Sequence, residues 1–156
     1  MAGPPDERPK HSFRDTSLAG ARFEGVDLSG ARLDDVTLRG ARLRDVDLGG
    51  ASFDDVDLGG ATLANVGAEG ARLDDVDLKG AVVKNATLAG ARLDDVSLEG
   101  ARVTNAGAQK STWHDVDLSG ARLTNVDLSN VVIDDANVEG LVINGVRVGD
   151  LLAKKG

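Results

Sequence analysis

The sequence predicts an all-β solenoid made of short extended edges, with a change of direction every five residues. From His11 to Asp150 the chain divides without a gap into 28 groups of five residues, called pentads below. The third residue is apolar in all 28 pentads, and the fifth is Gly, Asp or Asn in 27 of them, with Lys110 as the exception. This period fits neither the repeat of about 3.6 residues of a helix nor the two-residue repeat of a strand.

The residue types within a pentad predict where each side chain points. The first residue is mostly Ala or Val and the third is mostly Leu, whereas the second and fourth are mostly polar. The first and third side chains are therefore expected to point inward. Gly, Asp and Asn at the fifth position tolerate the positive φ of a tight turn. Each pentad is thus predicted to form one side of a square coil that ends in a corner.

Composition excludes several classes of protein. The 156 residues include 20 Gly, three Phe, one Trp, no Tyr and no Cys, so disulfides and thiolate metal sites are excluded. No apolar run approaches the ~20 residues of a membrane span. The start, MAGPPDERPK, lacks the apolar stretch of a secretory signal, and we expect a cytoplasmic protein. A net charge of −8 disfavours direct binding to nucleic acid through its phosphates.

Several pentads are close copies of one another: VDLSG (26–30 and 116–120), VDLGG (56–60) and ARLDD (31–35, 71–75 and 91–95). They resemble the A(D/N)LXX motif of the pentapeptide-repeat family. The resemblance implies a right-handed quadrilateral parallel β-helix with four pentads per coil, and hence about seven coils over residues 11–150. At a spacing of about 4.8 Å these coils would form a rod roughly 34 Å long. Residues 1–10 are predicted to be a disordered N-terminal tail and residues 151–156 a C-terminal cap or tail.

With four pentads per coil, pentads 20 residues apart lie on one side of the rod. We call the side containing 31–35 face one, and the next three sides in chain order faces two, three and four. Face one carries 12 Asp against four Arg, a net charge of −8, whereas face three carries six basic and two acidic residues, a net charge of +4. Face one therefore holds the candidate partner-binding residues Asp34, Asp35, Asp54, Asp55, Asp74, Asp75, Asp94, Asp95, Asp115, Asp134 and Asp135.

Two positions in the predicted interior depart from the pattern. Ala68 and Ala108 occupy the large inward position on face four, where Leu is usual, and the missing volume predicts a cavity. Trp113 is the next large inward residue after Ala108. We expect its indole to fill the space beside that alanine.

The stretch from residue 131 to the C-terminus is the most apolar part of the chain. An open end of a β-helix exposes unpaired strand edges and apolar side chains, so it needs a cover. The candidates for a cap are Leu141, Ile143, Val146, Val148, Leu151 and Leu152. The resemblance implies an alternative, a homodimer that pairs through the C-terminal coils.

Catalytic signatures are absent from the sequence. His11 and His114 are 103 residues apart and neither repeats along a face, and no Gly-rich phosphate loop is present. A flat row of Asp offers no pocket to shift a pKa for acid–base chemistry, so we expect no enzymatic activity and no cofactor or metal site. Weak binding of Ca²⁺ along this row is a less favoured alternative.

The charge pattern favours a non-enzymatic binding or scaffold protein that acts on a protein partner through its charged faces. The resemblance adds a sharper alternative, because acidic family members of the fluoroquinolone-resistance type mimic duplex DNA and bind DNA gyrase or a related topoisomerase. About 34 Å of duplex DNA carries about 20 phosphate charges. Residues 11–150 carry 24 acidic side chains, but 14 basic ones reduce the net charge to −10.

Overall fold

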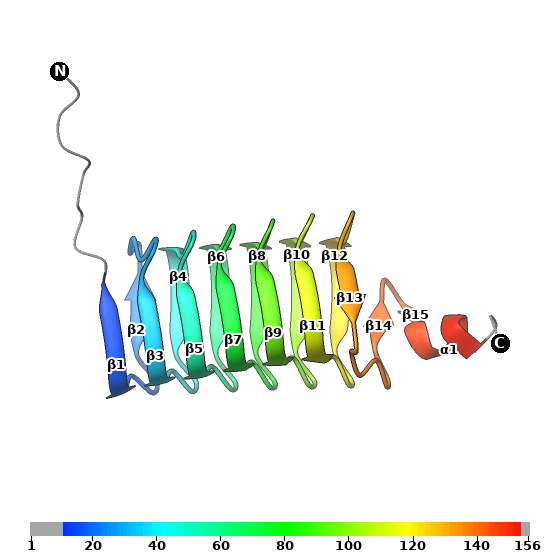
Figure 1. Cartoon of the computed structure of the whole chain (residues 1–156), viewed down its shortest axis with the longest axis horizontal. Coiled ribbons are helices and arrows are strands. Elements are labelled where there is room, and N and C mark those ends of the chain that lie inside the picture. The colour runs from blue at the N-terminus through cyan, green and yellow to red at the C-terminus, as the bar shows by residue number, and fades with distance from the viewer. Residues whose placement is uncertain (1–10, 154–156) are drawn as a thin grey trace, which may run out of the picture.

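The computed structural model describes residues 11–153 and confirms a parallel β-helix of about seven coils (Figure 1). One sheet has seven strands: β1 (Ser12–Ser17), β3 (Arg32–Thr37), β5 (Ser52–Asp57), β7 (Arg72–Asp77), β9 (Arg92–Ser97), β11 (Thr112–Asp117) and β13 (Val132–Asp134). The other has eight: β2 (Arg22–Glu24), β4 (Arg42–Asp47), β6 (Thr62–Gly67), β8 (Val82–Thr87), β10 (Arg102–Gly107), β12 (Arg122–Asp127), β14 (Val142–Ile143) and β15 (Val146–Arg147). A short helix, α1 (Val148–Ala153), follows.

The strand register confirms four pentads per coil. Leu33 lies beside Phe53 and Leu43 beside Leu63, in each case one coil and 20 residues apart. The same offset runs through the parallel pairs of both sheets, so equivalent pentads stack directly on one another. Face one therefore lies on the first sheet and face three on the second.

The corners are of two kinds. Faces two and four end in type II turns: the N–H of Ala41 donates to the C=O of Leu38 at 2.9 Å, with Gly40 at φ 63°. On faces one and three the strand continues through the corner. Asp34 and Val36 each pair with a residue of the next coil, whereas Asp35 between them, with a φ of 53°, pairs with none. Every fifth residue from Asp15 to Gly145 has a positive φ, as the pentad pattern predicts, including Lys110.

Acidic residues on faces two and four help to build the type II turns. Asp47 accepts a hydrogen bond from the N–H of Gly49 at 2.8 Å, and Asp77 accepts one from Lys79 at 2.7 Å. Asp27, Asp57, Asp117 and Asp127 make the same bond to the residue two places later. These bonds fix the backbone just before each turn, so this set of carboxylates has a structural role.

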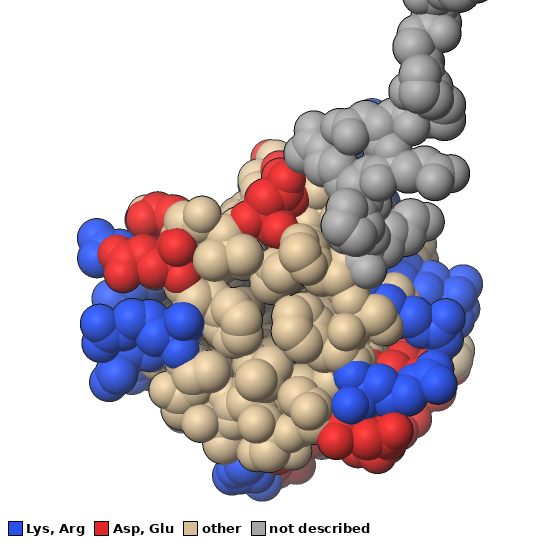
Figure 2. Space-filling view, turned by 90° about the vertical axis from the view of Figure 1, so that its left-hand side faces the viewer, with Lys and Arg blue, Asp and Glu red and all other residues tan. Residues whose placement is uncertain are grey.

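The interior is a narrow bore filled by the first and third residues of the pentads. Ala, Val and Leu side chains from all four faces form one continuous buried cluster. Figure 2, which views the rod from its N-terminal end, shows uncharged side chains in the middle and charged groups around the rim. The stack of coils therefore separates an apolar interior from a charged wall.

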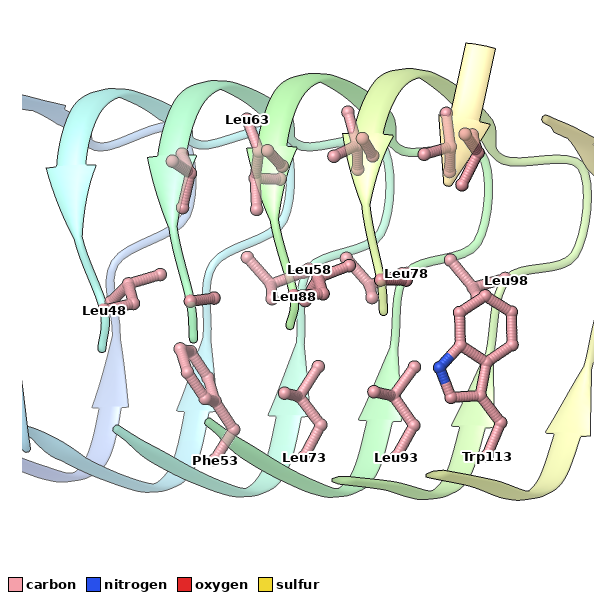
Figure 3. Close-up of a pocket in the computed structure, with 18 of the residues that line it drawn as sticks. Leu48, Phe53, Leu58, Leu63, Leu73, Leu78, Leu88, Leu93, Leu98 and Trp113 are labelled. Atoms are coloured by element: carbon pink, nitrogen blue, oxygen red, sulfur yellow. The ribbon is translucent and has the colours of Figure 1, made fainter. Parts of the chain in front are cut away.

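The cavity predicted from Ala68 and Ala108 is present in the bore. It measures about 70 Å³ and is lined by apolar side chains, including both alanines, Ala86 and Trp113 (Figure 3). The Trp113 side chain points into the bore beside Leu98. Because space remains, the indole fills only part of the volume left by the alanines.

The C-terminal end departs from the pentad frame. The coil stops after Ile143, and Asn144 and Gly145, at φ 48° and 84°, turn the chain back so that β15 pairs antiparallel with β14. An Asn-Gly pair with two positive φ values is the usual two-residue hairpin turn. Residues 146–150 therefore form a strand and the start of α1 instead of a last side. α1 has six residues, and no helix in the described range 11–153 is long and apolar enough to cross a membrane.

Candidate binding faces

Face one presents two parallel rows of carboxylates. The fourth residues of its pentads form one row, in which Asp34, Asp74 and Asp94 are half-buried while Asp54 and Asp134 are exposed. The fifth residues, which form the corner, make the second row, and all of its candidates are exposed: Asp35, Asp55, Asp75, Asp95, Asp115 and Asp135. The structure thus brings all the predicted face-one residues together on one side of the rod.

Arginines neutralise part of the first row. Asp34 accepts a hydrogen bond from Arg14 of the preceding coil at 2.7 Å. Asp74 and Asp94 are each bound by the arginine two residues before them, at 2.9 Å for Arg72 and 2.8 Å for Arg92. These pairs are largely exposed to water, so each contributes little to stability.

The corner row lacks such neutralisation along its middle. Within residues 11–153, Asp55, Asp75 and Asp95 have no ion pair. Desolvation and then the neighbouring charges of Asp55 and Asp95 raise the pKa of Asp75. The pKa of Asp35 is raised in the same way by desolvation and by Asp55 and Asp15. Ionised neighbours along this row therefore repel one another.

His114 interrupts the first row where another Asp would stand. Its Nδ1 lies 3.1 Å from Asp94 and 3.4 Å from Asp115, and its Nε2 lies 3.8 Å from Asp135. The hydrogen bond to Asp94 and the charge of Asp115 raise the pKa of His114. Hydrogen bonds from Arg92 and His114 lower the pKa of Asp94. His114 thus links carboxylates of three successive coils.

On face three, the corner residues of successive coils are joined by side-chain hydrogen bonds. The side-chain amide of Asn65 donates to the Asp45 carboxylate at 2.8 Å, and Asn85 donates to Asn65 at 3.0 Å. Asn105 donates to Asn85, and Asn125 donates to Asn105, both at 3.2 Å. Successive corners are therefore joined by a chain of hydrogen bonds that ends on a carboxylate, which we call the amide ladder. An amide can donate and accept at once, whereas two carboxylates side by side can only repel.

The two rows share one backbone geometry. Asp75 has φ 53° and Asn85 has φ 52°, and both lie at a bend inside a continuous strand. Asn therefore fits the corner as well as Asp does, and its side chain donates a hydrogen bond to the corner of the preceding coil. The Asp row on face one is not required by the fold.

The residues proposed as a cap lie at the C-terminal end with different degrees of burial. Leu141 is buried, and Ile143 and Val148 pack partly buried against the core. The other three are about half exposed: Val146 at 48%, Leu151 at 53% and Leu152 at 57%. Residues 1–10, predicted to be a tail, and residues 154–156 lie outside the described residues.

Sequence reasoning missed two sets of residues. It counted every Asp as surface charge, although Asp followed two residues later by Gly, Ser or Lys before a corner indicates a carboxylate bonded to backbone. It expected Asn at the corners for its tolerance of a positive φ, and it did not predict the hydrogen bonds of the amide ladder formed by Asn65, Asn85, Asn105 and Asn125. Their spacing of 20 residues, combined with four pentads per coil, is the signal that could have predicted the contact.

The charged side chains among residues 11–153 lie along open walls of the rod. No group of three or more His, Asp or Glu among residues 11–153 is placed to hold a metal ion. His114 is more than half exposed and contacts carboxylates on an open wall. What the faces offer is rows of charge at the spacing of the coils, which suits binding.

Three solved structures are among those similar to this chain. HetL, a pentapeptide repeat protein involved in heterocyst differentiation regulation from Nostoc sp. strain PCC 7120, is 17% identical, with 87% of this chain and 92% of HetL covered and a TM-score of 0.40. AT2G44920 from the Arabidopsis thaliana thylakoid lumen is 28% identical over 65% of this chain and 68% of that one, with a TM-score of 0.41. QnrB1, a plasmid-mediated fluoroquinolone resistance protein, is 18% identical over 93% and 86%, with a TM-score of 0.40.

Sequence comparison gives the family directly. No curated protein matches the chain. Two family descriptions of pentapeptide repeats do match, one over residues 18–66 and the other over residues 71–106 and 114–147. With the coil geometry above, these matches show that the chain belongs to the pentapeptide-repeat family.

Proposed function

We propose that this protein is a non-enzymatic binding protein that uses face one to contact a positively charged site on a protein partner. The observation that carries the proposal is the contrast between the two corner rows. Asn85 and its neighbours bond to one another, whereas Asp75 repels Asp55 and Asp95 in the same geometry. A row of carboxylates that weakens the fold, where amides would strengthen it, is expected of a surface kept for binding.

The distribution of acidic residues supports this assignment. Asp on faces two and four accepts backbone hydrogen bonds before the type II turns, so its presence there is explained by the fold. Asp55, Asp75 and Asp95 have no such bond within residues 11–153. Their charge is left available to a partner.

The partner that fits best is a protein whose basic site receives duplex DNA. Neighbouring Asp residues in a row are one coil apart, about 4.8 Å, and two rows run side by side along the rod. Duplex DNA likewise presents two rows of negative charge, with phosphates about 3.4 Å apart along each strand. The spacing is similar in scale, and face one carries −8. DNA gyrase or a related topoisomerase is the specific candidate that the family resemblance suggests.

The C-terminal end is a candidate for pairing with a second copy. Exposed apolar side chains gather there on β13, β15 and α1, including Val132 at 52% exposure and Leu152 at 57%. A homodimer through this end would cover them and extend the acidic face to twice its length. We expect light scattering to give a dimer mass that falls to the monomer mass in Leu151→Glu/Leu152→Glu.

Competition with duplex DNA for gyrase tests the role of face one. The variant Asp55→Asn/Asp75→Asn/Asp95→Asn removes three charges with residues that the same corner accepts on face three. The control Glu69→Gln/Glu99→Gln/Glu139→Gln removes three charges from faces two and four. We expect the wild type and the control to inhibit supercoiling at micromolar concentration, and the Asn variant to need about tenfold more protein or greater.

Each failure has a distinct meaning. No inhibition by the wild type contradicts gyrase as the partner. Inhibition that survives the Asn substitutions contradicts face one as the contact surface. Equal loss in the Asn variant and the Glu control contradicts a localised site, because only net charge would then matter.

A further inference from the structure

A recess opens on face three, on the side of the rod away from the acidic rows. It lies over β2, β4 and β6 and is lined by Arg22, Glu24, Arg42, Leu43, Arg44, Thr62 and Ala64. The recess forms because Arg42 and Arg44 lie beside Thr62 and Ala64 of the next coil, and these two residues have short side chains. The long arginine side chains of the first two coils thus border an open space.

The recess has unbalanced positive charge. The register places Arg22 beside Arg42 and Glu24 beside Arg44. Within residues 11–153, Arg22 and Arg42 have no ion pair, and the one for Arg44 is a 3.7 Å contact between its Nε and the exposed carboxylate of Asp45. Three guanidinium groups therefore border the recess with one carboxylate, Glu24, on its rim.

Arginine side chains in this arrangement suit an oxyanion. A guanidinium group presents several N–H donors in a plane and binds the oxygens of phosphate or sulfate in pairs. The hydroxyl of Thr62, which also lines the recess, adds a further donor. The recess measures about 240 Å³. That volume leaves ample room for a phosphoryl group.

We propose that this recess binds a phosphate group, with Arg22, Arg42 and Arg44 as its ligands. The phosphate would reduce the repulsion between the neighbouring guanidinium groups and occupy the space above Thr62 and Ala64. The site is separate from face one, so it gives the rod a second, oppositely charged contact surface. The phosphate source is either free inorganic phosphate or a phosphate ester on a larger molecule.

Arg102 and Arg122 provide a matched control on the same face. They lie side by side in the same register as Arg22 and Arg42. The residues two places later are Thr104 and Thr124 instead of Glu24 and Arg44, so this pair lacks the third guanidinium group. A general attraction of anions to basic side chains would act on both pairs, whereas a phosphate site would act on the first pair alone.

NMR titration with inorganic phosphate, against chloride at matched ionic strength, tests the proposal on the full chain. We expect phosphate-specific shifts of the Arg22, Arg42 and Arg44 side-chain signals in the wild type. Arg42→Gln should weaken the affinity about tenfold or more, and Arg122→Gln should change it less than about twofold. Glu24→Gln should strengthen it severalfold, because it removes the opposing carboxylate.

The same titration can overturn the proposal. Absence of phosphate-specific shifts in the wild type, or equal weakening by Arg42→Gln and Arg122→Gln, would leave only diffuse attraction of anions. A second series with a nucleoside monophosphate and the unphosphorylated nucleoside identifies the source. The proposal requires the unphosphorylated nucleoside to leave the three arginine signals unchanged, and movement of those signals would contradict a site for phosphate.

Discussion

The indole N–H of Trp113 donates a 2.9 Å hydrogen bond to the hydroxyl of Ser111 inside the bore. Ser111 is fully buried and in turn donates to the C=O of Ala108 at 2.6 Å. The equivalent residue in the preceding coils of face one from Ala31 onward is Ala. The serine is therefore the partner that allows the most polar aromatic side chain of the core to be buried.

Ser111→Ala should destabilise the protein although it restores the usual residue. The indole N–H would lose its partner in an apolar interior, and we expect a loss of about 1–3 kcal/mol in the free energy of unfolding. Urea denaturation measures it. In a Trp113→Phe background the same substitution should cost much less, because only the hydrogen bond from Ser111 to Ala108 is then lost, and an equal loss in both backgrounds would contradict the pairing.

The cavity in the bore predicts opposite effects of one substitution at two positions. Ala68→Leu adds a side chain where Leu48 and Leu88 stand in the neighbouring coils, and it should stabilise by about 1 kcal/mol. Ala108→Leu would crowd Trp113 and should destabilise by roughly 1–3 kcal/mol. Thermal unfolding of the two variants checks this, and a gain of stability from Ala108→Leu would show that the indole leaves that space empty.

The amide ladder predicts a pH-dependent defect in Asn85→Asp. The new carboxylate would face the side-chain oxygen of Asn65 without a proton to donate, and we expect a loss of about 1 kcal/mol near neutral pH. Protonation at low pH would restore a donor, so the defect should shrink there. Urea denaturation at two pH values measures it, with Asn130→Asp, at a corner on face four, as the control. A defect independent of pH would contradict the ladder as its cause.

The contacts of His114 predict how the stability of the protein changes as the pH rises above 6.5. Asp94 and Asp115 raise its pKa in the folded protein above the ordinary value of 6.5. The stabilisation is therefore fully present below pH 6.5 and is lost as the pH rises through the folded-state pKa. The difference in unfolding free energy between wild type and His114→Gln should follow this course.

The Asp94→Asn background provides the control for His114. Removal of the carboxylate that accepts its hydrogen bond should greatly reduce the pH-dependent difference between wild type and His114→Gln. An unchanged pH profile in that background would contradict the contact with Asp94. Asp115 and Asp135 would then be the groups that raise the pKa of His114.

Much of the fold follows from the pentad pattern because each position has one physical task. The positive φ at Asp35, Gly40 and Asn65 and the inward direction of Leu33 could be predicted from residue type and spacing alone. The end of the coil could not, because the pentad frame runs on through Asn144-Gly145 while the hairpin turn there competes with it. The local turn preference of Asn144-Gly145 decided the outcome there.

The candidate site was predicted in position but not in energetic detail. The columns of face one place Asp55, Asp75 and Asp95 together because the register is regular. Some carboxylates accept a hydrogen bond from the backbone N–H two residues later, as Asp57 does from Gly59, and others remain available to a partner. Residue spacing alone did not separate the two groups. The arginine recess arises because long and short side chains lie beside one another in three successive coils. The net charge of a whole face does not show this difference in length.

Stability and partner binding of Asp55→Asn/Asp75→Asn/Asp95→Asn, measured together, test whether the corner carboxylates serve binding. We expect this variant to unfold at a higher temperature than the wild type, because repulsion along the corner is replaced by amide hydrogen bonds of the kind seen at Asn85. We also expect the same variant to lose competition with duplex DNA for gyrase. A variant that is less stable than the wild type, or that competes equally well, would contradict the claim that these carboxylates serve binding at the expense of the fold.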